Sequence, residues 1–325
     1  MELLKVENLA IEEISKVKRI VVDEINFTVN RGETVGIVGE SGSGKTVTAM
    51  SILRLLSDDL KISTGKIFFQ GEDISKYSEK DMEKLLGNDL SVVFQNPISS
   101  LNPLMKVGKQ IGEVIEKHRG IKGNELKNMV YEILKDVGFP DYEDVYIKYP
   151  HELSGGQGQR IGIAMAIANS PKLIIADEPT TALDKNVQEQ ILLLLKNIQK
   201  KYNSAIIFIS HDLGVIRRIT DRAVVMYFGQ IVEIGKTEEI FNNPKHPYTK
   251  GLLDSLPENF RRGERIKVMK GTIPSIDDKI EGCYFSPRCS HKLPICKCER
   301  IKLETLGNRI IRCINPLKEG QHEEK

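Results

Sequence analysis

Apolar runs typical of buried strands alternate along the chain with stretches that keep a helical period. Five runs predict strands: TVGIVG (34–39), LSVVFQ (90–95), KLIIAD (172–177), AIIFIS (205–210) and AVVMY (223–227). Asp184 is the expected cap of a helix whose apolar side chains share one face: Val187, Ile191, Leu194, Leu195 and Ile198. Strands that alternate with helices indicate an α/β fold with a largely parallel sheet.

The pattern changes twice along the chain. From about residue 96 to 161 helical segments predominate, which predicts a helical lobe inserted between two core strands. After Phe241, prolines and glycines interrupt every segment. We therefore expect a main domain over residues 1–240 and a small C-terminal extension over 241–325.

The sequence GESGSGKT fits the phosphate-loop pattern G-x-x-x-x-G-K-[ST]. A predicted strand precedes it and a helix-like segment follows, so backbone N–H groups and a helix N-terminus should converge on an anion. Lys45 is expected to contact the β- and γ-phosphates of a nucleotide, and Thr46 to offer its hydroxyl to Mg²⁺. The expected binding residues are Gly39, Ser41, Gly42, Ser43, Gly44, Lys45 and Thr46.

Polar residues follow three later strands of the predicted sheet. Asp177 ends an apolar run and is expected to hold Mg²⁺, directly or through water. Glu178 places a second carboxylate beside Asp177, and repulsion between the two negative charges makes this placement poor for stability. A role in orienting or deprotonating the attacking water would explain it. Gln95 is expected to reach the Mg²⁺ or the water, and His211 the γ-phosphate. The other histidines, including His246, are expected at the surface.

Charge and hydropathy narrow the class of protein. The net charge is +2 over 325 residues, and no basic stripe marks a nucleic-acid binder. No apolar run approaches the roughly 20 residues that cross a bilayer. The acidic start, MELLKVENLAIEE, does not read as a secretory signal. We expect an intracellular protein that is not embedded in a membrane, in which structural disulfides are disfavoured.

All five cysteines lie between Gly282 and Cys313. Four of them have the spacing C-x5-C-x6-C-x16-C: Cys283, Cys289, Cys296 and Cys313. This lacks the close pairs of zinc fingers and suits an iron–sulfur cluster, although a zinc site with four thiolates stays open. Cys298 could replace Cys296 as a ligand, and His291 is a remote alternative; we favour Cys296. Metal binding at such a site would stabilise a segment that has too few apolar residues to fold alone.

The sequence LSGGQ (153–157) adds a second potential phosphate-binding helix N-terminus. Together with GESGSGKT, Gln95, LIIADEP, ALD (182–184) and His211, it makes residues 1–240 resemble the ATP-binding subunits of ABC transporters. The resemblance implies an α/β P-loop NTPase core, with a RecA-like lobe and an antiparallel β subdomain, plus an inserted α-helical lobe.

The resemblance also implies that two such subunits sandwich two ATP molecules head to tail. Asp184 would lie at the dimer seam, and Gln95 between the lobes, near the membrane subunits. Four residues would contact the γ-phosphate held by the partner's loop: Ser154, Gly155, Gly156 and Gln157. The family often stacks adenine on an upstream aromatic residue, but no aromatic precedes Phe27 here. Adenine is instead expected on Lys16, Arg19 or Ile14.

Further segments resemble the oligopeptide and dipeptide importer branch of this family. They are FQNPISSLNPLMKVGKQI, HDLGVI, HPYTKGLL, GTIPS and GCYFSPRC, and HDLGVI favours the first of that branch's two paired ATPases. The branch implies two permease subunits, a second similar ATPase subunit (with a homodimer left open), an extracellular peptide-binding protein, a location at the cytoplasmic face of the membrane and a [4Fe–4S] cluster on the four cysteines. Peptide as the solute rests on the resemblance alone.

Two other functions compete with this one. A soluble ABC-type ATPase acting on nucleic acid or ribosomes should have two ATPase halves or a long coiled coil, and the sequence has neither. A metal-sensing or redox module with an inactive ATPase is disfavoured by the complete motif set. The sequence thus predicts an ATPase that energises peptide import, with no nucleic-acid partner.

Overall fold

A computed structural model describes most of the chain, namely residues 1–15, 19–181, 183–256, 269–274, 278 and 280–318. The chain forms two compact units. The first unit comprises residues 1–3, 29–34 and 70–209, and the second unit comprises residues 4–28, 35–69 and 210–325. Residues 210–325 therefore share a compact unit with the phosphate loop, and the boundary expected near residue 240 does not separate the two units.

The first unit is built on parallel strands that are buried along their length. β7 (Leu173–Asp177) pairs in parallel with β6 (Leu90–Val93) and with β8 (Ala205–Ser210), with Leu173 opposite both Leu90 and Ala205. Continuous apolar runs of this kind are typical of parallel strands covered on both faces. The remaining elements include β5 (Glu72–Asp73), α2 (Glu79–Leu85), α8 (Lys185–Tyr202) and the 3₁₀ turns η1 (Ile74–Lys76) and η2 (Pro150–Glu152).

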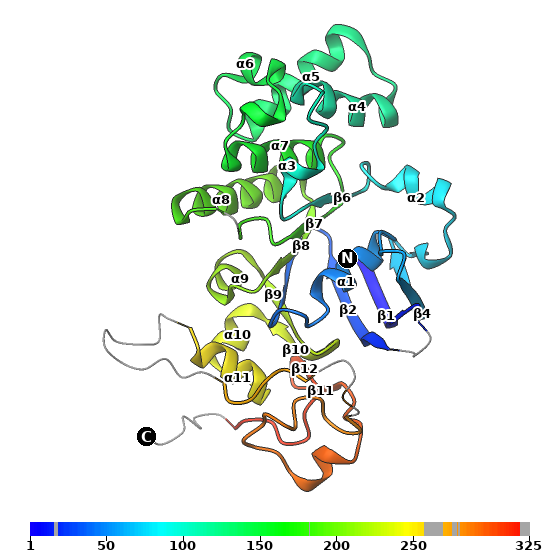
Figure 1. Cartoon of the computed structure of the whole chain (residues 1–325), viewed down its shortest axis with the longest axis vertical. Helices are drawn as coiled ribbons and strands as arrows, with labels where there is room; N and C mark the ends of the chain where they lie inside the picture. Colours follow the sequence, from blue (N-terminus) through cyan, green and yellow to red (C-terminus); the bar gives the residue numbers. More distant parts are fainter. Residues whose placement is uncertain (16–18, 182, 257–268, 275–277, 279, 319–325) are drawn as a thin grey trace. The chain divides into compact units, whose positions relative to one another are not determined.

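Helices fill the range expected to be helical. They are α3 (Pro97–Ser100), α4 (Val107–Arg119), α5 (Gly123–Asp136), α6 (Tyr142–Ile147) and α7 (Gly155–Ile167). Apolar side chains at helical spacing, such as Ile111 and Ile115 of α4 and Val130 of α5, are fully buried. A Cβ atom on Gly108 would lie 2.2 Å from the Tyr146 ring, so the close approach of α4 and α6 requires glycine. Figure 1 shows these helices grouped together.

The second unit contains an antiparallel group and a mixed sheet. β1 (Glu2–Glu13) pairs with β2 (Ile20–Asn30) and β4 (Leu60–Phe69). In the mixed sheet, β3 (Thr34–Val38) is parallel to β9 (Arg222–Tyr227), which is antiparallel to β10 (Gln230–Lys236). The helices of this unit are α1 (Lys45–Ile52), α9 (Leu213–Ile219), α10 (Thr237–Asn242), α11 (Pro247–Asp254) and the 3₁₀ turn η4 (Pro294–Lys297). The α/β prediction is confirmed.

The C-terminal segment adds two strands to this sheet. β12 (Arg309–Ile311) pairs with β10, and β11 (Glu304–Leu306) pairs with β12 (Figure 1). A buried ion pair joins Arg309 to Glu233 of β10 at 3.0 Å. Arg309 is 7% exposed and Glu233 is fully buried, so removing either partner would leave a buried charge.

One strand is shorter than predicted. β6 ends at Val93, two residues before Gln95, because its pairing with β7 stops at Val93 and Ala176. Phe94, the next residue, is 39% exposed. Gln95 therefore belongs to the loop that follows the strand. Across the residues that the structure describes, none of the helices has the length and hydropathy needed to span a bilayer.

Candidate nucleotide site and cysteine pocket

The phosphate loop connects β3 to α1, and three of its glycines have a steric reason. Gly42 and Gly44 have φ angles of 77° and 92°, which side chains with a Cβ atom rarely adopt. A Cβ atom on Gly39 would lie 2.1 Å from the carbonyl oxygen of Met226. Since Lys45 and Thr46 are the first residues of α1, the loop places them at a helix N-terminus, as expected for an anion site.

Lys45 is held over the loop from which it projects. Its side chain is nearly buried, and Nζ donates to the carbonyl oxygens of Gly39 and Glu40, both at 2.9 Å. Thr46 is exposed, so its hydroxyl is accessible to a ligand. The phosphate contact of Lys45 and the Mg²⁺ contact of Thr46 stay predictions.

Glu40, the second residue of the loop, makes contacts that the sequence analysis missed. Its carboxylate pairs with both terminal nitrogens of Arg288, at 2.7 and 3.0 Å. Its N–H donates to Tyr248 Oη at 2.9 Å. The carboxylate raises the pKa of the Arg288 guanidinium. The only signal in the sequence was an acidic residue inside a loop expected to bind anions.

The first unit brings Gln95 and Glu178 together. Gln95 Nε2 donates to a carboxylate oxygen of Glu178 at 3.4 Å, and Thr181 Oγ1 donates to the same oxygen at 2.9 Å. Glu178 has a φ angle of 46°, a conformation uncommon for residues other than glycine, and its N–H donates to the Ile209 carbonyl at 3.0 Å. Asp177, the last residue of β7, is 8% exposed.

The LSGGQ segment forms a capped helix start, as predicted. Ser154 caps α7: its Oγ accepts from the Gln157 N–H at 3.3 Å, and Gln157 Oε1 accepts from the Ser154 N–H at 3.0 Å. Ser154 and Gly155 are exposed. A Cβ atom on Gly156 would lie 2.6 Å from the Val187 side chain, so glycine allows α7 to approach α8. Asp184 caps α8, as predicted, through the N–H groups of Asn186 and Val187.

The remaining predicted contacts divide between the units. His211 is exposed directly after β8 and belongs to the second unit. Ile14 is 55% exposed, and Arg19 pairs with Glu13 at 3.4 Å. Lys16 and Ala182 lie outside the described residues. Because Gln95 and the two carboxylates belong to the first unit, their joint action with the phosphate loop on one nucleotide stays a prediction.

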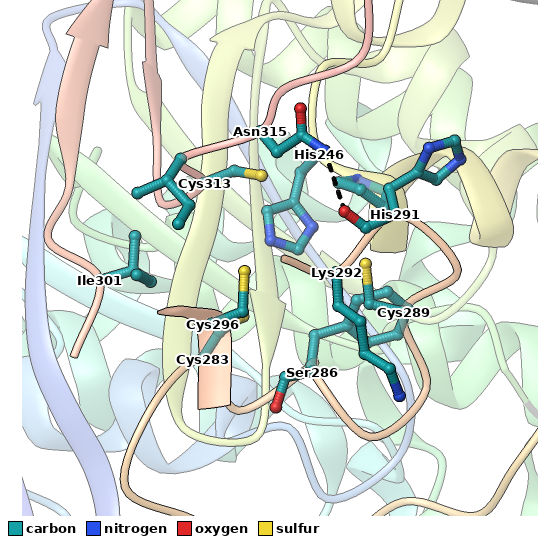
Figure 2. A pocket seen from close by; sticks show the side chains of 13 residues that line it. His246, Cys283, Ser286, Cys289, His291, Lys292, Cys296, Ile301, Cys313 and Asn315 are labelled. Atoms are coloured by element: carbon teal, nitrogen blue, oxygen red, sulfur yellow. Dashed lines mark hydrogen bonds between the residues drawn. The ribbon is translucent and has the colours of Figure 1, made fainter. Parts of the chain in front are cut away.

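The four predicted cysteines line one pocket of the second unit, and Figure 2 shows Cys283, Cys289, Cys296 and Cys313 around it. The pocket encloses about 330 Å³, part of it open to solvent. Cys298 is exposed and is not one of its lining residues. The Cys283 N–H donates to the Cys296 carbonyl at 2.8 Å, and a Cβ atom on Gly282 would lie 2.2 Å from that oxygen.

Burial controls the ionisation of the groups around this pocket. It raises the pKa values of Cys283 and Cys289, and it raises the pKa of Cys313 to about 12. Within the described part of the chain, no group of three or more His, Cys, Asp or Glu side chains is gathered closely enough to hold a metal ion. The four cysteines thus share one pocket, and burial disfavours the thiolate form of Cys283, Cys289 and Cys313.

His246 also lines the pocket, and the expectation that it lies at the surface was wrong. It is 1% exposed, and burial lowers its pKa to about 3. Its Nδ1 accepts from the Tyr248 N–H at 3.0 Å, so the neutral imidazole caps α11. In Figure 2 its ring lies among the cysteine side chains. Histidine is a rare helix cap, so this role could not be predicted from the residue type.

Two protein-family models match separate parts of this chain. Residues 22–181 match the family model described as ABC transporter, and residues 232–296 match that of the oligopeptide/dipeptide transporter C-terminal region. The oligopeptide transport ATP-binding protein AppD of Bacillus subtilis is 42% identical over 324 residues, which cover 99% of both chains. The dipeptide transport ATP-binding protein DppD of Haemophilus influenzae is 44% identical and covers 92% of this chain and 90% of its own.

Solved structures show the same likeness over the larger part of the chain. The ATP-binding cassette MJ0796, solved as a dimer bound to ADP and Pi, has a TM-score of 0.65 and 28% identity over 72% of this chain and 99% of its own. The protein cbiO1 of Clostridium perfringens, part of the transporter complex cbiONQ, has a TM-score of 0.64 and 30% identity over 74% of this chain and 90% of its own.

Proposed function

Since the chain belongs to the ATP-binding proteins of ABC transporters, in the branch that imports oligopeptides and dipeptides, it is an ATPase, and we propose how its residues couple ATP hydrolysis to that import. The observation that carries the proposal is the phosphate loop. Its glycines are required by backbone angles and a close contact, and Lys45 is held over it by two carbonyl oxygens.

In the proposed reaction, loop N–H groups and Lys45 bind the β- and γ-phosphates of ATP. Thr46 and Asp177 would hold Mg²⁺, with Gln95 at the metal or at the water, and a bound ion would offset charge on the phosphate oxygens. Glu178 orients the attacking water and accepts its proton, and His211 contacts the γ-phosphate. The bonds from Gln95 and Thr181 to Glu178 support this role, because they fix the carboxylate beside the proposed Mg²⁺ ligand Asp177.

We propose that two ATPase subunits close around two ATP molecules and move two permease subunits at the cytoplasmic face of the membrane. The exposed start of α7, with Ser154 and Gly155, supports a contact to the nucleotide of the partner subunit. A second, similar ATPase subunit is the expected partner, with a homodimer as the alternative, and an extracellular binding protein delivers the peptide.

The cysteine pocket is the proposed site of a [4Fe–4S] cluster. Four cysteines line it, and iron–sulfur clusters are held by four thiolates. A zinc ion held by the four thiolates is the alternative. Bound there, the cluster would tie Cys283, Cys289, Cys296 and Cys313 together.

Transport tests the proposed function directly. The intact complex, reconstituted into vesicles, should accumulate labelled dipeptides or oligopeptides with MgATP on the side of this subunit, and not with MgADP. Free amino acids serve as the matched solute control. ATP hydrolysis without peptide accumulation, or purification of the chain in a complex with RNA and no permease, would contradict the proposal.

Metal analysis tests the proposed cluster separately. Anaerobically purified protein should be brown and contain iron and acid-labile sulfide in equal amounts, about four of each per chain. A colourless protein with one zinc ion per chain would overturn the cluster and establish the zinc alternative.

A further inference from the structure

The loop that binds phosphate in this protein contains an acidic residue. Glu40 directly follows Gly39, and its side chain is 25% exposed. A triphosphate is strongly anionic, so an unpaired carboxylate at this position would repel the nucleotide. Glu40 therefore needs a partner that offsets its charge and fixes its direction.

Arg288 of the C-terminal segment is that partner. Its guanidinium forms a two-pronged ion pair with Glu40 at 2.7 and 3.0 Å, and its side chain is 4% exposed. The guanidinium lies 5.7 Å from the centre of the Tyr227 ring and 5.9 Å from that of Phe285. Bidentate geometry and aromatic walls fix the direction of an arginine, which an exposed surface pair does not achieve.

A second contact holds the backbone of the same residue. Tyr248 is fully buried on α11, and its Oη accepts the Glu40 N–H at 2.9 Å. The Glu40 carbonyl in turn accepts from Lys45 Nζ at 2.9 Å. The side chain and the N–H of Glu40 are thus held by residues after position 240, while its carbonyl contacts the phosphate-binding lysine.

These two contacts also reach the cysteine pocket. Arg288 directly precedes Cys289, and Tyr248 N–H donates to His246, which lines the pocket. Tyr227, Tyr248 and Phe285 pack as one aromatic group, with ring centres 4.6 to 5.4 Å apart. A change that displaces the segment from Cys283 to Cys289 would therefore displace the partner of Glu40.

We propose that Arg288 and Tyr248 are positioning residues of the ATP site, which act through Glu40. Arg288 cancels the charge that would repel the triphosphate, and Tyr248 fixes the peptide whose carbonyl orients Lys45. The C-terminal segment thereby sets the affinity for MgATP without touching the reacting atoms. This inference rests on the proposed use of the loop for ATP, and it does not require the cluster.

Steady-state ATP titrations of the intact complex test it. Arg288→Gln should raise the KM for MgATP roughly 3- to 10-fold and leave kcat within about 2-fold, since it affects binding of the charged ligand. The defect should shrink as salt is added, because screening weakens the repulsion. Arg288→Lys keeps the positive charge but not the two-pronged geometry. Its KM should lie between that of the parental protein and that of Arg288→Gln.

Charge rescue separates this role from general support of the fold. In the double variant Glu40→Gln/Arg288→Gln the KM for MgATP should return most of the way to the parental value, because a neutral side chain does not repel phosphate. Arg300→Gln is the matched control. Arg300 also ties the C-terminal segment to β2, through Asp23 at 2.6 Å, but it does not pair with the loop, so the KM of this variant should stay unchanged.

Two results would overturn the inference. A parental KM in Arg288→Gln would show that the ion pair does not affect nucleotide binding. An equal defect in Arg288→Gln and in the double variant would show that the arginine only supports the fold. If the unmodified complex bound no ATP, the proposed function itself would fail, which the same titration reveals before any variant is compared.

Discussion

The phosphate loop and the cysteine pocket belong to one compact unit and are both proposed binding sites, yet they are built in opposite ways. The loop is a run of consecutive residues whose glycine angles and helix start determine its shape. Up to sixteen residues separate successive cysteines of the pocket, and its lining includes His246, which caps α11. The loop therefore depends on local sequence, and the pocket on tertiary packing.

This difference predicts how each site should respond to change. A substitution in the loop removes a nucleotide contact directly, and the fold around it has little reason to change. A substitution in the pocket acts through packing, and it would reach the nucleotide through the contacts of Arg288 and Tyr248 with Glu40. The substitutions with the largest expected effects separate the chemical step from nucleotide binding. Those with the smallest measure how the cysteine pocket affects nucleotide binding.

Glu178→Gln should give the largest effect. Removing the proposed base should lower kcat roughly 10²- to 10⁴-fold, while ATP still binds, because glutamine keeps the shape without accepting the proton. Phosphate release and nucleotide binding are measured on the same preparation. Glu132→Gln, which breaks only an exposed pair with Lys135 on α5, is the control and should keep the parental rate. A parental kcat in Glu178→Gln would refute the assignment.

Lys45→Ala should weaken ATP binding by about 100-fold, since it removes the positive charge placed for the β- and γ-phosphates. Equilibrium binding of a labelled ATP analogue measures this loss. Circular dichroism should show an unchanged fold, because the bonds that Lys45 Nζ donates to the Gly39 and Glu40 carbonyls and to Ser43 Oγ lie within its own loop. Lys135→Ala, on the surface of α5, is the matched control. Nucleotide binding at parental affinity would argue against the loop as the ATP site.

Cys296→Ser should remove most of the iron, whereas Cys298→Ser should retain it. Cys296 lines the pocket and Cys298 does not, although the two lie one residue apart. Iron and sulfide analysis of anaerobic preparations gives the contrast. The Cys296 variant should also melt several degrees lower, because metal binding contributes to folding. Loss of iron from Cys298→Ser alone would exchange the two roles.

The smallest effect is expected where the two sites meet. Removing the metal with a chelator should raise the KM for MgATP only about 2- to 3-fold, through a looser segment around Arg288. In the Glu40→Gln/Arg288→Gln background the same treatment should have a smaller effect on KM, because only the Tyr248 contact to the loop remains. An equal shift in both backgrounds would mean that the pocket influences ATP binding by another route.

The sequence predicted features that depend on neighbours in the chain. The strands, the loop glycines, the helix start at LSGGQ and the cap Asp184 lie where local patterns put them. The strand to Gln95 was predicted too long, since apolar character continues at Phe94 while the pairing with β7 ends. Cys283, Cys289, Cys296 and Cys313 line one pocket, and their predicted role as cluster ligands stays a prediction.

Other features could not be read from the sequence because they join distant segments. Glu40 and Arg288 are 248 residues apart, and neither residue type marks the other. Histidine is a polar residue type that is expected at the surface. The packing of α11 nevertheless buries His246 beside Phe285, with ring centres 5.8 Å apart. Long-range pairs of this kind follow from the fold rather than from periodicity or motif spacing.

Peptide uptake by vesicles that contain the intact complex, with the parental subunit or with Glu178→Gln, tests the central claim most directly. ATP binding and labelled dipeptide accumulation are measured on the same vesicles. The parental complex should accumulate peptide as ATP is consumed, and the variant should bind ATP and accumulate none. Accumulation by the variant at the parental rate would contradict the claim that ATP hydrolysis at this subunit drives import.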